Sequence, residues 1–392
     1  MYVPAPAWLA NCVHPNSLTR ATVERRLRRI GLLGSRNSTK DTGHLHVRSQ
    51  KVYARGSVAE RVPRHMISPP KPTLERWSLK QWQSFEAQHA APIFHARLAW
   101  AVALHDTNPE IVPAPHVLRL PSGETVFLPL VRSSGGRLPW RCFEGVPQGH
   151  NVFLTMDGKA VEGELLREAL DALSRCSVDS LVLNLWPALN VLKPPNWSAR
   201  YFSASVLDLS LGAEAALARM SSVARRLGEH SRKAGIVCFP QSDAGAVHRF
   251  YDLQPERWAK THALVGQRFL HTLVKHAPRD VEIWFAYHEG RAIAGAVVLF
   301  GSHEAYIWLT AVVPDVMPLR PLSLMHMCGV QAAAARGLRW YNLGSSENLP
   351  DVQRLKAALG APAVPFARLT LEKGVFRLYR QLRNRRAAQP VA

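Results

Sequence analysis

The most regular alternation of apolar and polar residues lies between Val281 and Gly360, where it predicts strands and helices in turn. Short runs rich in β-branched and aromatic residues predict four strands, Val281–His288, Ala292–Phe300, Ala305–Val313 and Leu338–Leu343. Apolar residues at helical spacing predict two helices, Leu322–Arg336 and Pro350–Leu359, each followed by a glycine that would end it. Three antiparallel strands, a helix, a strand and a helix would form a compact α/β core.

A weaker pattern of the same kind precedes this core. A hairpin is predicted around Ser122-Gly123, with strands His116–Leu120 and Glu124–Val131, and it is followed by a helix at Val161–Arg175 and a strand at Ser180–Trp186. In both halves a hairpin precedes a helix, a short break and a strand that ends in Asn-Leu. We interpret this as a degenerate internal duplication, with a chance similarity of two α/β units as the alternative.

Helices are expected for much of the remaining sequence. Leu74–Ala90 has apolar residues at amphipathic helical spacing, and Ala91–Leu104 continues in the same way. Between the halves, Pro187–Ser198 is a Pro-rich connection, and Ala213–Gly235 is expected to be one basic helix. The sequence that follows predicts a short strand and two more helices, at Ile236–Phe239, Ala244–Asp252 and Pro255–His276.

Positive charge is concentrated at the two ends of the 392-residue chain. The net charge is +20, of which residues 1–66 carry +9 and residues 368–392 carry +6, so that all other residues together carry +5. Residues 1–66 have no sustained apolar period and are expected to be disordered. They fit a solvated tail, a nucleic-acid-binding arm, or a segment that is not translated, since Met66 fits a native start.

The composition is typical of a cytoplasmic globular protein. No apolar run reaches the roughly eighteen residues that a membrane span needs, and no segment near the N-terminus has the form of a signal peptide. The five cysteines are widely spaced and contain no Cys-x-x-Cys pair, which argues against a disulfide framework and a zinc site. We therefore expect a cytoplasmic protein without a membrane span; the sequence leaves its oligomeric state open.

Three short segments of the second half have a recognisable order and spacing. They are Tyr306-Ile307-Trp308, Tyr341-Asn342-Leu343-Gly344-Ser345-Ser346 and Leu355-Lys356-Ala357-Ala358-Leu359-Gly360. The last resembles a Phe-Lys-x-x-Phe-Gly segment with Leu in place of both Phe. Together they resemble the FemABX and CelD/BcsL-type acyltransferases, a branch of the GNAT superfamily, over about Leu74 to Leu371.

The resemblance implies an α/β fold of tandem GNAT-like domains with mixed, largely antiparallel sheets. Residues 1–66 would be a basic extension, 67–200 the first half, 201–371 the second, catalytic domain and 372–392 a basic tail. The implied reaction moves an acyl group, most simply acetyl, from acyl-coenzyme A to an amine or hydroxyl of a sugar, peptide or cell-envelope polysaccharide precursor. Two alternatives stay open: an aminoacyl-tRNA-dependent, Fem-type transfer, and a non-enzymatic nucleic-acid-binding protein that uses the basic ends.

Acyl transfer from an activated donor needs positioning, a proton acceptor and polarisation of the carbonyl. In GNAT domains the donor pyrophosphate rests on a Gly-rich turn before the helix that follows the third core strand. Here that turn is Pro314–Pro321, which contains no glycine. Arg320 is expected to supply charge beside this helix and Ser323 to cap it. The resemblance implies that Lys356 lines the same donor site.

The remaining candidates follow the last predicted strand, where α/β sheets expose ligands. Ser345, Ser346 and Glu347 lie there, and Glu347 is a candidate general base if it is desolvated. The catalytic candidates are Glu347, Ser345 and Tyr306. The donor-binding candidates are Arg320, Ser323, Ser346 and Lys356. The histidines of the predicted helices lack ligand spacing, so no metal is expected; the plainer alternatives are surface cations for Arg320 and Lys356 and a core position for Tyr306.

Overall fold

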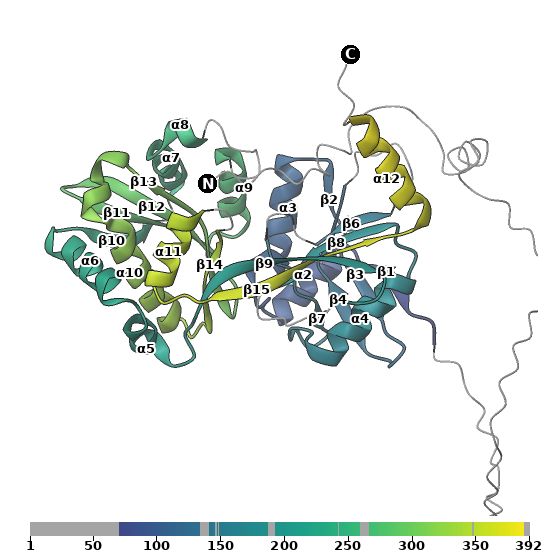
Figure 1. Ribbon diagram of the computed structural model, residues 1–392. Helices are drawn as coiled ribbons and strands as arrows, with labels where there is room; N and C mark the ends of the chain where they lie inside the picture. Colours follow the sequence, from purple (N-terminus) through teal and green to yellow (C-terminus); the bar gives the residue numbers. More distant parts are fainter. Residues whose placement is uncertain are drawn as a thin grey trace, which may run out of the picture.

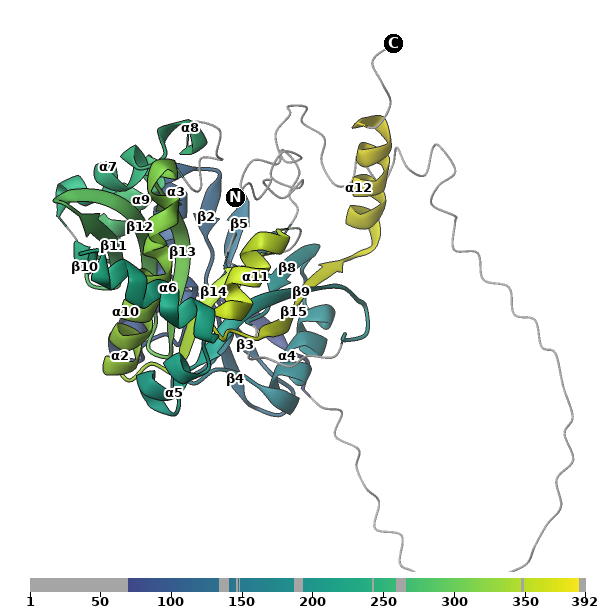
Figure 2. The same ribbon diagram turned by 60° about the vertical axis from the view of Figure 1, so that its left-hand side comes forward.

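One large sheet crosses the molecule, and a computed structural model describes it together with its helices over residues 70–133, 141–145, 147, 149–186, 193–241, 243–258, 266–346 and 349–387. The large sheet has eleven strands of mixed direction and extends through both halves (Figures 1 and 2). A second, four-stranded antiparallel sheet belongs to the first half. The predictions for residues 1–66 lie outside the described residues.

The first half consists of short strands and three α-helices. The helices are α2 (Leu79–Gln88), α3 (Leu98–Thr107) and α4 (Gly163–Arg175), with a 3-10 turn η1 (Phe94–Ala96) before α3. The strands are β1 (Thr73–Arg76), β2 (Ile111–Pro113), β3 (His116–Arg119), β4 (Thr125–Leu128), β5 (Val131–Ser133), β6 (Cys142–Glu144), β7 (Leu154–Thr155) and β8 (Ser180–Asn184). A reciprocal capping box between Ser78 and Gln81 begins α2.

The second half begins with a long strand and continues with the predicted α/β core. Its strands are β9 (Trp197–Asp208), β10 (Val237–Gln241), β11 (Val281–His288), β12 (Arg291–Phe300), β13 (Glu304–Val312), β14 (Trp340–Ser345) and β15 (Ala363–Glu372). Its helices are α5 (Gly212–Ala218), α6 (Ser222–Lys233), α7 (Ala244–Asp252), α8 (Pro255–Trp258), α9 (Gln267–His276), η3 (Pro314–Leu319), α10 (Pro321–Ala335), α11 (Pro350–Ala358) and α12 (Gly374–Ala387). Glu289 and Gly290 both have positive φ, as a type I′ hairpin turn requires.

The strand order of the large sheet supports the internal duplication. The order is β10-β11-β12-β13-β14-β9-β15-β8-β6-β5-β2, so β9, β14, β13, β12 and β11 on one side correspond to β15, β8, β6, β5 and β2 on the other. The parallel pair β13–β14, connected by α10, matches the parallel pair β6–β8, connected through α4. One strand crosses from the second half to the first, since β15 pairs with β8 on one side and with β9 on the other.

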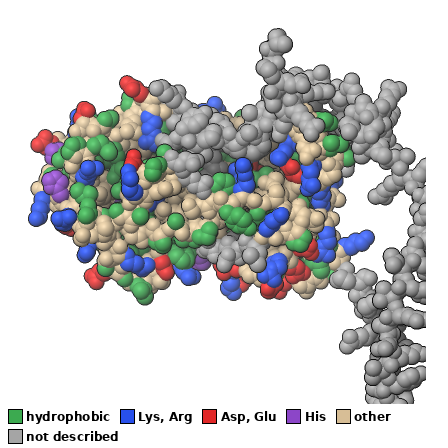
Figure 3. Space-filling model, viewed as in Figure 1, with side chains coloured by type: hydrophobic (Ala, Val, Ile, Leu, Met, Phe, Trp, Pro, Cys, Tyr) green, Lys and Arg blue, Asp and Glu red, His purple; other side chains and the backbone are tan. Residues whose placement is uncertain are grey.

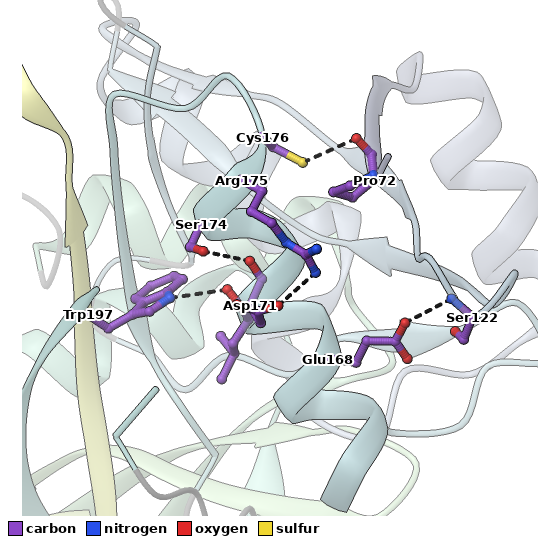
Figure 4. A network of polar contacts seen from close by, with 9 residues as sticks. Pro72, Ser122, Glu168, Asp171, Ser174, Arg175, Cys176 and Trp197 are labelled. Carbon is purple, nitrogen blue, oxygen red and sulfur yellow. Dashed lines mark hydrogen bonds and ion pairs between the residues drawn. The ribbon is translucent and has the colours of Figure 1, made fainter. Parts of the chain in front are cut away.

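Helix α4 is fixed to the first half by its apolar side and by polar contacts (Figure 4). The indole of Trp197 on β9 donates a hydrogen bond to the Leu170 carbonyl at 3.1 Å. The Glu168 carboxylate accepts from the Ser122 main-chain N–H at 2.9 Å. The buried residues of α4 are Leu166, Ala169, Leu170, Ala172 and Leu173. Trp197 of β9 therefore faces α4, and the alternate residues of this strand that begin with Ser198 point to the opposite side of the sheet.

The structure corrects three predicted elements. Leu74–Ala90 is not one helix, because Thr73–Arg76 pairs with β3 as a strand and the helix begins only after Ser78. Ala213–Gly235 is two helices, because the Ser221 side chain accepts from the Ala224 N–H and begins a new one. Glu124–Val131 divides between β4 and β5, which belong to different sheets.

No strand is predicted from the sequence at β9 or β15, although together they form the centre of the large sheet. Positions 200 and 371, where we divided the chain, lie within these two strands. Residues 374–387 form α12, which projects from the end of β15 (Figure 1). The C-terminal part of the chain is therefore joined to the first half through a central strand.

Candidate active site

The parallel strands β13 and β14 separate in the middle of the second half. In the described part of the chain they pair at three positions, from Glu304–Trp340 to Tyr306–Asn342. Beyond Tyr306, β13 continues beside β12, whereas β14 continues beside β9. Main-chain groups just past Tyr306 and Asn342 therefore lie at a divergence of two strands, which is a suitable place to hold an acyl carbonyl.

A buried carboxyl joins the two halves at this divergence. Glu304 accepts a hydrogen bond from the Trp186 indole N–H at 2.8 Å and from the Asn342 side-chain amide at 2.5 Å. Trp186 follows β8 of the first half, whereas Glu304 and Asn342 belong to β13 and β14. Burial raises the pKa of Glu304 to about 7, and the two hydrogen bonds oppose that shift.

The same network fixes the end of β14. The Asn342 side-chain oxygen accepts from the Gly344 N–H at 2.8 Å. The Lys356 ammonium on α11 donates to the Gly344 carbonyl at 2.9 Å and to the Ser345 carbonyl at 3.2 Å. Lys356 is only 8% exposed, and burial lowers its pKa to about 8. The main chain at Gly344 and Ser345 is thus held from both sides.

Tyr306 stands against this fixed main chain. Gly344 has φ +71°, and a Cβ added to it would lie 3.2 Å from the Tyr306 hydroxyl oxygen. Glycine therefore provides both the left-handed backbone and the close approach. Burial, together with the charge of Glu304, raises the pKa of Tyr306, so its hydroxyl keeps its proton and is available as a hydrogen-bond donor.

Two histidines of the first half surround the Tyr306 ring. His95 makes an edge contact with it at a centroid distance of 4.9 Å, and His150 does so at 6.1 Å. Burial lowers the pKa of His150 to about 4, and burial together with His150 lowers the pKa of His95. His95 Nε2 and His150 Nδ1 are buried without a hydrogen-bond partner among the described residues. Both rings are therefore neutral near pH 7, with a ring nitrogen that could accept a proton.

Glu144 holds the equivalent position in the first half. Glu144 pairs with Val182, two residues before Asn184, just as Glu304 pairs with Trp340, two residues before Asn342. Burial raises the pKa of Glu144 to about 8, and one of its carboxyl oxygens has no hydrogen-bond partner in the described part of the chain. The duplication thus includes a buried glutamate, but only the second half has a connected network around it.

The structure brings four of the predicted site residues together. Tyr306, Ser345 and Lys356 meet at the divergence of β13 and β14, and Ser346, which is buried, follows directly. Arg320 and Ser323 lie apart from them, at the N-terminus of α10. Glu347 lies outside the described residues.

The expected role of Ser323 as a helix cap is wrong. Helix α10 begins at Pro321, its N-cap is Arg320 in the left-handed conformation, and no side chain caps it. The Ser323 N–H instead donates to the Arg320 carbonyl at 3.0 Å. The Arg320 side chain is exposed beside this turn.

The first turn of α10 does not fit the pyrophosphate of coenzyme A in the manner of Gly-rich GNAT domains. Pro321 has no N–H, and the Ser323 N–H is already bonded within the turn. The Leu319 and Arg320 carbonyls both accept from the Ser231 hydroxyl of α6, at 2.7 and 3.1 Å. A run of free main-chain N–H groups, which anion binding at a helix start requires, is therefore absent from this described turn.

The sequence gives little indication of five residues that build the site. They are His95, His150, Trp186, Glu304 and Asn342. Only the repeated Asn-Leu at the ends of β8 and β14 pointed to Asn342. The others act across the boundary between the halves, and no local pattern marks them. Among the described residues, no three His, Cys, Asp or Glu side chains gather so that they could hold a metal ion. The described helices include none that is long and apolar enough to cross a membrane.

Comparisons with known proteins agree with this architecture. Residues 217–349 match the family model described as an acetyltransferase (GNAT) domain. The crystal structure of FemX is 11% identical, covers 79% of this chain and 100% of its own, and superposes with a TM-score of 0.57. The chain therefore contains a GNAT acetyltransferase domain and has a tandem GNAT fold that FemX shares.

Two further structures superpose less closely. A conserved protein of unknown function from Bacteroides thetaiotaomicron VPI-5482 is 7% identical and covers 76% of this chain and 99% of its own, with a TM-score of 0.49. A tandem GNAT protein from the clavulanic acid biosynthesis pathway is 15% identical and covers 78% and 99%, with a TM-score of 0.42. A search of curated proteins gave no match.

Proposed function

We propose that the protein is an acyltransferase whose reaction takes place at Tyr306, between the halves, and whose acceptor is an amine or hydroxyl of a sugar, peptide or cell-envelope polysaccharide precursor. The observation that carries this proposal is the network Trp186–Glu304–Asn342–Gly344–Lys356. It fixes the main chain at the divergence of β13 and β14 and places the Tyr306 hydroxyl against it. Such a rigid, desolvated arrangement is what acyl transfer requires.

The residues have distinct roles in this reaction. The acceptor nitrogen or oxygen attacks the acyl carbonyl carbon, and its proton passes to a neutral imidazole, His95 or His150. The tetrahedral intermediate then expels the leaving group, which takes a proton from the Tyr306 hydroxyl; the imidazolium returns a proton to the tyrosine. Lys356 is a positioning residue, because its ammonium is bonded to the carbonyls of Gly344 and Ser345.

The acyl donor that GNAT domains generally use is acyl-coenzyme A, and acetyl-coenzyme A is the simplest proposal here. Arg320, exposed beside α10, would be the charged contact to its phosphates. A second candidate, transfer from an aminoacyl-tRNA, is favoured by the first turn of α10, which lacks a run of free N–H groups. It is also favoured by the net charge of +6 over residues 368–392. We propose a cytoplasmic enzyme, with a CelD/BcsL-type role in polysaccharide synthesis as the finer alternative within the family.

The test compares donors and a matched pair of tyrosine variants. Acetyl-coenzyme A and aminoacyl-tRNA are each supplied with a panel of amino sugars and peptides, and acylated product is measured by mass spectrometry. Tyr306→Phe should lower the rate about 10²- to 10⁴-fold, as expected for loss of a positioned acid. Tyr287→Phe, which removes a hydroxyl bonded to Gln241 on β10, should retain the rate. Full activity of Tyr306→Phe would contradict the proposed site.

A further inference from the structure

Two arginines face each other at the centre of the large sheet, where β15 of the second half lies between β9 and β8. The antiparallel register of β9 and β15 places Arg200 directly opposite Arg368. Like charges at directly opposed positions destabilise a sheet. Within the described residues, no carboxylate lies within ion-pair distance of either guanidinium. The buried carboxyl of Glu144 lies near Arg368, where burial raises its pKa and the charge of Arg368 opposes that shift.

The next pair of residues on the same face of β9 and β15 borders a basic cleft. Ser198 lies opposite Thr370, on the side of the sheet that carries the two arginines, and both residues line a cleft of about 440 Å³ beneath α12. Its cationic lining residues are Lys193, Arg377 and Arg380. Arg380 is paired with Glu372 at 2.5 Å, whereas Arg377 donates to the Glu372 main-chain carbonyl at 2.8 Å. Glu372 also lines the cleft and its carboxyl interacts electrostatically with Arg377, whereas in the described chain Lys193 has no carboxylate within ion-pair distance.

On the other side of the arginine pair, the next pair on this face lies near the candidate active site. Phe202 lies opposite Phe366, and the two rings stack at a centroid distance of 5.6 Å. Phe366 also contacts the His150 ring at 4.8 Å, and His150 contacts Tyr306. Thr370 follows Phe366 by four residues of extended chain, a distance of about 13 Å along β15. One face of the β9–β15 pair therefore continues from the tyrosine, past the aromatic pair and the arginine pair, to the cleft.

We propose that Arg200, Arg368, Lys193 and Arg377, here called the basic strip, bind the phosphate or pyrophosphate group of an elongated substrate whose reactive end lies at Tyr306. The assignment of the reactive end rests on the proposed function, whereas the anion site stands on its own observations. Arginine provides a planar fork of donors suited to phosphate oxygens, and an anion between two opposed arginines would remove their repulsion. Figure 3 shows Lys and Arg side chains along the surface next to α12.

The direct test uses the full chain and inorganic pyrophosphate, with binding measured by isothermal titration calorimetry. Arg200→Ala and Arg368→Ala should each weaken binding at least tenfold, and Arg368→Lys should lose less than Arg368→Ala. The matched control is Arg167→Ala on α4, which removes an exposed arginine that is ion-paired with Glu164. This control should bind pyrophosphate like the wild type.

Thermal unfolding separates loss of the site from loss of the fold. Without ligand, Arg200→Ala and Arg368→Ala should melt at or above the wild-type temperature, because each removes one of two repelling charges. Pyrophosphate should raise the melting temperature of the wild type and of Arg167→Ala, and should have little effect on the two strip variants. A ligand-free melting temperature that falls by several degrees in both strip variants would show that the arginines stabilise the fold, and would overturn the proposal.

Competition distinguishes a small phosphorylated substrate from RNA. A nucleoside diphosphate should compete with pyrophosphate for the strip. Binding of a single-stranded RNA oligomer, with no binding of pyrophosphate or a nucleoside diphosphate, would overturn the proposal in favour of an RNA surface. Pyrophosphate binding is independent of turnover, so Tyr306→Phe should bind it like the wild type. If that variant binds pyrophosphate while the wild type transfers no acyl group from any donor tested, the proposed reaction fails and the anion site stands.

Discussion

Glu144 in the first half and Glu304 in the second occupy the same register position, but their surroundings differ. Glu304 accepts hydrogen bonds from Trp186 and Asn342. Glu144 has a carboxyl oxygen without a partner in the described chain, and Asn184 donates its main-chain N–H to the Asn151 side-chain oxygen rather than bonding Glu144. Duplication therefore reproduces the sheet geometry in both halves, whereas the hydrogen bonds that organise a site are present in one.

The difference arises from the way the halves meet. Trp186, His95 and His150 come from the first half, yet each makes its polar or ring contact with β13 of the second half. The second site is therefore built with residues of both halves. On its other side, the first half pairs through β8 with β15, which carries Arg368 of the basic strip. Four pairs of substitutions test this comparison, from the largest expected effect to the smallest.

Replacing the two buried glutamates should have the largest effect on stability, and this effect should grow as pH rises above about 4.5. A carboxyl whose folded pKa is raised stabilises the fold below its unfolded pKa of about 4.3 and loses that contribution as pH rises through the folded pKa. Glu144→Gln should therefore gain stability over the wild type as pH rises from about 4.5 to 8, by about 4–5 kcal/mol at pH 8. Glu304→Gln should gain less, because hydrogen bonds already stabilise that carboxylate. Urea unfolding at pH 5 and pH 8 measures both; a difference that does not change with pH would contradict the assignment.

The second pair of substitutions concerns the asparagines of β14 and β8, whose replacement should lower stability by different amounts. Asn342 is fully buried, and its side chain bonds both Glu304 and the Gly344 N–H. Asn342→Ala should cost about 3 kcal/mol, since it leaves a buried carboxyl and an N–H unsatisfied. Asn184→Ala should cost less than about 1 kcal/mol, because its half-buried side chain is replaced without breaking the main-chain bond to Asn151. Equal losses in denaturant unfolding would show that the halves are equally organised.

Lys356 tests whether the network needs its buried cation. Lys356→Met keeps the length of the side chain but leaves the Gly344 and Ser345 carbonyls without their donor, and should cost about 1–3 kcal/mol of stability. Arg354→Met on the same helix, where the guanidinium is exposed, should change stability by about 0.5 kcal/mol or less. Calorimetric unfolding of both variants distinguishes a positioning role from that of a surface cation. No loss in Lys356→Met would place this lysine on the surface.

Substitution of Gly344 should change stability least of the four, but it should lower activity strongly. Gly344→Ala and Gly337→Ala both place a side chain at positive φ, so each should cost about 1 kcal/mol. Only at Gly344 does the new Cβ meet the Tyr306 hydroxyl, at 3.2 Å, whereas nothing lies within 4 Å at Gly337. Acyl transfer should therefore fall about tenfold or more in Gly344→Ala alone, given the sensitivity of transfer to sub-ångström displacement. Equal rates in both variants would separate Tyr306 from the reaction.

Local pattern was sufficient for the elements between Val281 and Gly360. Val281–His288 and Ala292–Phe300 form strands within one residue of the predicted bounds, and the positive φ of Gly337 and Gly360 ends the two predicted helices. Alternating β-branched residues and glycine stops are local signals, which need no partner elsewhere in the chain. Tyr306, Ser345, Ser346 and Lys356 could be named for the same reason, because they belong to short segments with a recognisable order.

Long-range pairing had no such signal. Strands β9 and β15 were missed because their residues alternate between a more apolar face and a face carrying Phe, Arg, Ser and Thr, a mixture that is common in loops as well. His95 and His150 look like ordinary helix and loop residues until the fold places them beside Tyr306. Lys356 could be recognised, but its burial against two carbonyls could not, because that depends on how α11 packs on β14.

The sequence by itself determined the class of fold, the duplicated strand–helix–strand units and the segments around Tyr306, Gly344 and Lys356, because these depend on periodicity and on turn residues next to one another in the chain. The tertiary structure decided that β15 crosses to the first half, that two first-half histidines close around a second-half tyrosine, and that Arg200 faces Arg368. Each of these depends on sheet register between segments far apart in the chain, and register is set by the packing of the whole core rather than by any one segment.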